Sequence, residues 1–173
     1  MLDLLAAGGP HQDHAGELML FGRFVGAWDM EGEQIAAGGD VTAFRGEWRF
    51  GWVLDGRAIQ DVLVSPGLEY GTTVRFYDPA TRVWEITWIT PPGRAVRRLQ
   101  ARPDGDDIVL VGRDPAGHLL RWTFTAIAPR SFTWSGFRSD DEGGSWRQDE
   151  EMRLTRRPDG SATPGTTPPS RRW

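Results

Sequence analysis

The polar residues that could do chemistry in this chain are few and widely separated. Arg97 stands two positions before Leu99, and Glu150 stands two positions before Met152. In extended chain, residues two apart share a face, so each charged group is predicted to point the same way as an apolar neighbour. A carboxylate or phenol held on such a face can serve as a general acid or base. Glu150, Tyr70 and Arg97 are therefore the candidate catalytic residues, and no one of them is singled out.

Aromatic residues are more numerous and are regularly spaced. In the segment GEWRFGWVLDGRAIQD, residues 46–61, three aromatic side chains occupy every second position and share one face. The same alternation continues through later segments and is predicted to turn several polar side chains inward with the rings. An apolar cavity with a few convergent polar groups is the usual form of a small-molecule site. The predicted ligand-binding residues are Trp48, Phe50, Trp52, Gln60, Phe76, Trp84, Trp88, Arg97, Trp134, Gln148 and Glu150.

The alternative interpretation is a solid core. In that case Arg97 and Glu150 form one buried pair and the tryptophans only fill volume. Burying an arginine among aromatic rings costs several kcal/mol unless it is paired, so a ligand or Glu150 would have to be its partner.

Other kinds of site are poorly supported. The chain has no cysteine, and its three histidines are His11, His14 and His118. The first two precede the regular pattern and the third falls in a predicted turn, so no metal site and no cofactor are expected. Haem ligation by His118 is left open, although a solvent-exposed turn histidine is the simpler interpretation.

Length and composition indicate a single globular domain. The 173 residues carry a net charge of −4, which argues against a nucleic-acid partner. The arginine-rich stretch 93–102 is followed directly by acidic residues and is read as a solvated strand face. No apolar run approaches the length of a membrane span, and the acidic N-terminal segment does not resemble a secretory signal. A cytoplasmic protein that binds a small hydrophobic molecule is expected, with a homodimer through tryptophan-rich faces as a further possibility.

The elements that must position these side chains are mostly strands. Residues 12–25 carry apolar residues at helical spacing, and from there the period is two, with turn signals between about ten segments. We predict an all-β fold: a closed antiparallel up-and-down barrel of about ten strands with a short N-terminal helix, because closure removes the sheet edges. Residues 1–12 would form a flexible arm, 13–156 the barrel domain, and 157–173 a disordered tail rich in Pro, Gly, Ser and Thr.

Three segments carry a resemblance to known barrels. Gly26-Ala27-Trp28 resembles the Gly-x-Trp signature of lipocalins and related calycins, in which the tryptophan plugs the closed end of the barrel. The blocks at 70–89 and 139–156 are similar to those of an uncharacterised bacterial family of lipocalin-like barrels. The resemblance covers residues 20–156 and implies the fold, but it implies no activity.

The segment SDDEGGSW, residues 139–146, also fits the Asp-box pattern that sialidase propellers repeat. It occurs once here, so a hairpin turn is expected rather than a propeller. Asp141 should accept backbone N–H bonds, and Gly143 and Gly144 should supply positive φ angles.

A looser similarity connects the chain to phenolic acid decarboxylases, which are also barrels. The similarity implies a catalytic role for Arg57, but Thr90 stands where those enzymes carry a glutamate, and the first strand has no tyrosine. That chemistry is not expected. The favoured function is binding of a small hydrophobic or aromatic ligand in a Trp-lined cavity. The alternative is a cofactor-free enzyme, such as a cyclase, isomerase or decarboxylase-like barrel, that uses the same cavity.

Overall fold

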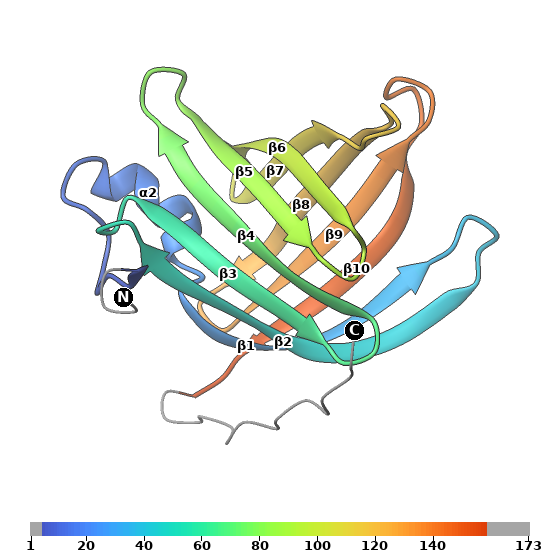
Figure 1. Cartoon of the computed structure of the whole chain (residues 1–173), viewed down its shortest axis with the longest axis horizontal. Coiled ribbons are helices and arrows are strands. Elements are labelled where there is room, and N and C mark those ends of the chain that lie inside the picture. The colour runs from blue at the N-terminus through green and yellow to red at the C-terminus, as the bar shows by residue number, and fades with distance from the viewer. Residues whose placement is uncertain (1–4, 159–173) are drawn as a thin grey trace.

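The structure, a computed structural model, describes residues 5–158 and confirms the predicted fold. Ten antiparallel strands form a closed barrel in the order β1-β10-β9-β8-β7-β6-β5-β4-β3-β2 (Figure 1). The elements are α2 (Ala15–Gly22), β1 (Gly26–Ile35), β2 (Val41–Val53), β3 (Ala58–Ser65), β4 (Glu69–Asp78), β5 (Val83–Thr90), β6 (Ala95–Asp104), β7 (Asp107–Arg113), β8 (Leu119–Ala128), β9 (Ser131–Ser139) and β10 (Arg147–Arg156). Most of the predicted tail, 159–173, lies outside the described residues.

The barrel closes because β1 pairs with strands from both ends of the chain. Trp28 is opposite Trp48 of β2 and opposite Arg156 of β10. The segment before α2 also contacts the sheet: the backbone N–H of Ala7 donates to Trp52 O at 2.9 Å, and that of His11 donates to Gly56 O at 3.1 Å.

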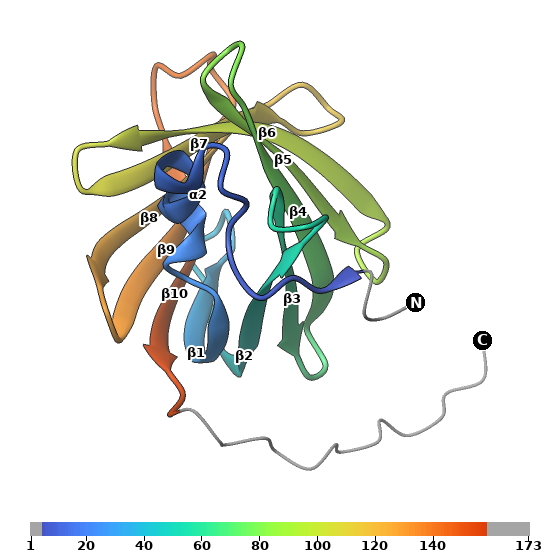
Figure 2. The ribbon, with the colours of Figure 1, turned by 90° about the vertical axis from the view of Figure 1, so that its left-hand side faces the viewer.

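One end of the barrel is filled by α2 and the residues that follow it (Figure 2). The helix is shorter than predicted and presents Leu18 and Phe21 to the interior. The Phe21 ring lies 5.0 Å from that of Trp84, and the Phe24 ring lies 4.7 Å from that of Phe132. These contacts make this end of the barrel a packed aromatic core.

Trp28 ties this closed end together. Its indole Nε1 donates to Phe24 O at 2.7 Å, and the Arg156 guanidinium lies 4.1 Å from its ring centroid. Arg156 also donates to Val25 O at 2.7 Å and to Arg23 O at 2.6 Å. The last strand is thereby joined to the chain between α2 and β1, and Trp28 is fully buried at this end of the barrel, the place that the Gly-x-Trp resemblance implies for it.

The predicted inner face of β3 and β4 was wrong. Ile59, Asp61 and Leu63 point into the barrel, so Gln60 and Val62 lie on the outside. On β4 the inward residues include Thr73 and Arg75, which leaves Tyr70, Val74 and Phe76 on the outer face, with Tyr70 48% and Phe76 47% exposed. The physical reason is an ion pair between Arg75 and Asp61, whose side chains are 3% and 0% exposed. Each charge makes the burial of the other possible.

The inward orientation predicted for Gln148 was also wrong. The pairing of β10 with β9 shifts register between Gln148, opposite Phe137, and Glu150, opposite Gly136. One extra residue, Asp149, enters the strand at this bulge and breaks the period-two alternation. Gln148 therefore shares the outer side with Glu151, to which it donates a hydrogen bond of 3.2 Å.

The β9–β10 hairpin follows the Asp-box expectation in most respects. Asp141 accepts the backbone N–H of Ser145 at 2.8 Å, and hydrogen bonds from Ser145 and Ser139 help to lower its pKa to about 2. Gly143 has a φ of 91°, as predicted. The prediction for Gly144 was wrong, since Glu142, with a φ of 56°, is the second residue of this turn with a positive φ.

Candidate functional site

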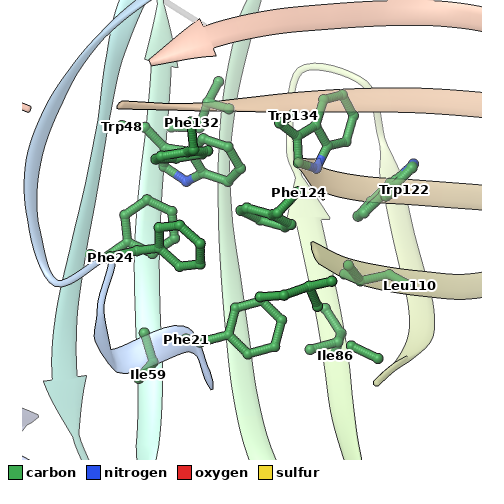
Figure 3. Packing of buried hydrophobic residues seen from close by; sticks show 14 of the residues in the cluster. Phe21, Phe24, Trp48, Ile59, Ile86, Leu110, Trp122, Phe124, Phe132 and Trp134 are labelled. Atoms are coloured by element: carbon green, nitrogen blue, oxygen red, sulfur yellow. The ribbon is translucent and has the colours of Figure 1, made fainter. Parts of the chain in front are cut away.

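A cavity of about 380 Å³ occupies the half of the barrel away from α2. Four tryptophans and Phe124 contribute to its wall: the ring centroids of Trp122 and Trp134 lie 5.5 Å apart, and those of Trp48 and Trp134 lie 6.5 Å apart. In Figure 3, Phe124 stands between Phe24 of the closed end and Trp122 of the cavity wall. The other apolar residues of the wall are Ile35, Ala36, Leu63, Trp88, Leu110 and Met152.

Strand register gathers polar groups at the end of the cavity farthest from α2. Thr42 of β2 is opposite Gln34 of β1, which is opposite Glu150 of β10. On the other side of the barrel, Arg97 of β6 is opposite Trp88. All of these side chains line the cavity. The site therefore has an aromatic body and a polar end.

The bulge in β10 gives the site two consecutive carboxyl groups, since Asp149 and Glu150 both line the cavity. Gly136, on the facing strand, makes room for the first of them. A Cβ atom at Gly136 would lie 2.9 Å from Asp149 Oδ1 and 3.0 Å from the Trp134 ring. Burial raises the pKa of the Asp149 carboxyl above its usual range, and the charges of Arg147 and Arg97 only partly oppose this effect.

The buried ion pair borders the same cavity. Asp61 Oδ1 accepts the backbone N–H of Thr73 at 3.0 Å, and Arg75 and Thr73 both line the cavity. The Arg75 guanidinium lies 5.2 Å from the ring centroids of both Phe21 and Phe50. Its Nη1 atom contacts Asp61 Oδ2 in the ion pair, and the residue lines the cavity.

Trp48 brings an unused hydrogen-bond donor to the wall. It is 3% exposed, and its Nε1 atom has no hydrogen-bond partner among residues 5–158. A buried donor without an acceptor costs about 1–3 kcal/mol. A hydrogen-bond acceptor on a bound ligand would therefore satisfy the Nε1–H group of Trp48.

The structure brings together only part of the predicted set. Trp48, Trp88, Trp134, Arg97 and Glu150 line the cavity. Phe50, Trp52 and Trp84 are buried in the barrel but are not part of the cavity wall. Gln60, Phe76, Gln148 and Tyr70 are on the outer face and cannot reach it.

Sequence reasoning missed three important members of the site: Trp122, Arg75 and Asp149. Trp122 could have been found, because it alternates with Leu120 and Phe124, although Arg121 made the orientation of that strand ambiguous. Arg75 and Asp149 could not be found from alternation, since an ion pair and a bulge override the pattern at these positions.

Two residues considered for other chemistry lie outside the cavity. Arg57 is an exposed residue of the β2–β3 turn, where it pairs with Asp55 at 2.6 Å. His118 lies in the β7–β8 turn, directly before β8, with its Nδ1 3.0 Å from Asp114 Oδ2 and 2.8 Å from Arg138 Nη2. Neither residue lines the cavity.

Comparison with known proteins supports the fold and assigns no family. No family model matches the chain, and no curated protein matches it. Among solved structures, Rv2717c from M. tuberculosis is similar, with a TM-score of 0.56, 16% identity, and coverage of 82% of this chain and 98% of that chain. The S-type phycobiliprotein lyase CPES from Guillardia theta is also similar, with a TM-score of 0.55, 12% identity, and coverage of 86% and 99%.

Residues 5–158 contain no helix long and apolar enough to cross a membrane.

Proposed function

We propose that the protein binds a small, flat, hydrophobic or aromatic ligand in the cavity between Trp48, Trp88, Trp122 and Trp134. The observation that carries the proposal is the cavity itself. Its volume of about 380 Å³ lies within the range of about 300–1,000 Å³ that is usual for small-molecule sites. Four indoles in its wall offer large apolar faces for a planar ligand.

The division of the barrel into two halves supports this function. The half near α2 is filled by side chains of the hydrophobic core. The other half keeps space between rings and places polar groups at its far end. The Nε1 atom of Trp48 would donate a hydrogen bond to an acceptor on the ligand, and Gln34, Arg97 and Glu150 would orient its polar end. The similarity to a phycobiliprotein lyase is compatible with ligand binding in a barrel of this kind.

A cofactor-free enzyme is the second candidate function, and Asp149 is the observation that favours it. A carboxyl that keeps its proton more strongly than usual is suited to general acid catalysis beside Glu150. Tyr70, the other acid–base candidate, is excluded from this role by its place on the outer face. Catalysis of this kind would also require a ligand in the cavity.

Filling the cavity should abolish binding. We expect Leu63→Trp to weaken the affinity for naphthalene-1-methanol, measured by isothermal titration calorimetry, by at least about tenfold, a change of about 1.4 kcal/mol. Leu63 is 3% exposed and lines the cavity, so a larger side chain there occupies the space that the ligand needs.

Val62→Trp is the matched control, because Val62 is the adjacent residue, points outward and is 43% exposed. It should leave the affinity within about twofold of the unmodified protein. If Leu63→Trp is not folded by circular dichroism, Leu110→Trp replaces it, since Leu110 also lines the cavity. Unchanged affinity in the folded cavity variant would contradict the proposed function.

A further inference from the structure

The charges that line the cavity are unequal in number. Three carboxyl groups, those of Asp40, Asp149 and Glu150, border the space. Two arginines also border it, but Arg75 is paired with Asp61, which is buried beneath the wall. Among the described residues, Arg97 is the one lining cation outside that buried pair, so lining carboxyl groups outnumber lining arginines that lack a buried partner.

Asp149 is the lining carboxyl group whose surroundings are most informative about a cationic ligand. Within the described residues it forms no ion pair, although Arg147, Arg97 and Arg138 lie near enough to act on it through space. Its carboxylate lies over Gly136 and beside the Trp134 ring, as the close approach of both to a Cβ at Gly136 shows. Burial raises its pKa and the nearby arginines only partly oppose this effect, so a further cation in the cavity would stabilise the ionised form.

The aromatic wall suits the same kind of ligand. An ammonium or other organic cation is attracted to the face of an indole, and tryptophan gives the strongest such interaction among the aromatic side chains. The interaction strengthens when water is excluded, and Trp48, Trp88, Trp122 and Trp134 are each less than 10% exposed. Carboxylates and indole faces together form a site for positive charge.

We propose that the ligand is an aromatic cation, whose rings lie among the four indoles and whose amine lies beside Asp149. This inference rests on the proposed function and adds the chemical class of the ligand to it. Arg97 does not oppose the assignment, because this one guanidinium lines the cavity together with three carboxyl groups, those of Asp40, Asp149 and Glu150.

Three probes of matched shape and different charge test this proposal: naphthalene-1-methylamine, naphthalene-1-methanol and 1-naphthoate. Isothermal titration calorimetry of the full chain at neutral pH gives the affinity for each. We expect the amine to bind at least about tenfold more tightly than the alcohol, and the carboxylate to bind most weakly.

The preference should depend on Asp149. Asp149→Asn is expected to bring the affinities for the amine and the alcohol to within about threefold of each other, with affinity for the alcohol retained. Glu151→Gln is the matched control: it removes one negative charge from the same strand, but Glu151 belongs to the outer side with Gln148 and Arg153. This variant should keep the preference for the amine.

The remaining outcomes separate the two proposals. Equal binding of all three probes, or tightest binding of the carboxylate, overturns the cationic ligand and leaves the binding function standing. A preference for the amine that persists in Asp149→Asn also overturns the role of this carboxyl. Absence of binding by all three probes contradicts the proposed function, and the inference with it.

Discussion

Replacing Arg75 by methionine is expected to lower the free energy of unfolding by about 3–5 kcal/mol, because it leaves Asp61 buried without its cation. Asp61 is 1% exposed, and within residues 5–158 its carboxylate accepts one other hydrogen bond, from the backbone N–H of Thr73 at 3.0 Å. A small domain is stable by only about 5–15 kcal/mol in total. Urea denaturation followed by circular dichroism would measure the loss.

The double variant Asp61→Asn/Arg75→Met is the control for this prediction. It removes both charges but keeps the side-chain oxygen that accepts the Thr73 N–H. Replacing a buried ion pair by uncharged groups of similar volume is often close to neutral, so the double variant should recover most of the lost stability. A loss of less than about 1 kcal/mol in the single variant would contradict the account of this pair.

The second large effect is expected at the closed end of the barrel. Phe24→Ala should lower the free energy of unfolding by about 3–5 kcal/mol, the usual cost of removing a buried phenylalanine ring. Phe24 is 1% exposed, and its ring lies 5.1 Å from that of Phe124 and 5.9 Å from that of Phe50. These ring contacts of Phe24 help to close the α2 end of the barrel.

Met19→Ala provides the comparison, since Met19 belongs to the neighbouring helix and is 44% exposed. Its effect should stay within about 0.5 kcal/mol, as for most surface substitutions. Thermal and urea unfolding of the two variants side by side would show whether the packed aromatic core, rather than the helix alone, stabilises this end. Equal losses in both variants would argue against that conclusion.

The fold could be predicted from the sequence because period-two alternation and turn signals are local properties. On β2, β5 and β9 the inward residues are strongly aromatic, so the more apolar face was also the buried one. On β3 and β4 this rule failed. Both faces of β3 carry aliphatic residues, and the choice was made by the pairing of Asp61 with Arg75 across the two strands. Alternation within a single strand contains no information about a partner on the next strand.

The candidate site was predictable where it is made of strand residues in regular register. Trp48, Trp88, Trp134 and Arg97 were found in this way. Asp149 was not found, because the bulge inserts one residue into β10 and changes which residues before it face inward and which face outward. The glycine opposite, Gly136, is the one local sign that the two strands approach closely at this point.

The central claim, that the space between four tryptophans takes a ligand, can be tested residue by residue. The chain has nine tryptophans, so a ¹H–¹⁵N spectrum of the indole N–H groups, assigned with single Trp→Phe variants, reports on each one. We predict that titration with naphthalene-1-methanol shifts the signals of Trp48, Trp88, Trp122 and Trp134 saturably. The signals of Trp28 and Trp84, in the closed end, and of Trp146, in the β9–β10 turn, should change little. Saturable shifts confined to Trp146, or no shifts at saturating probe, would contradict the claim.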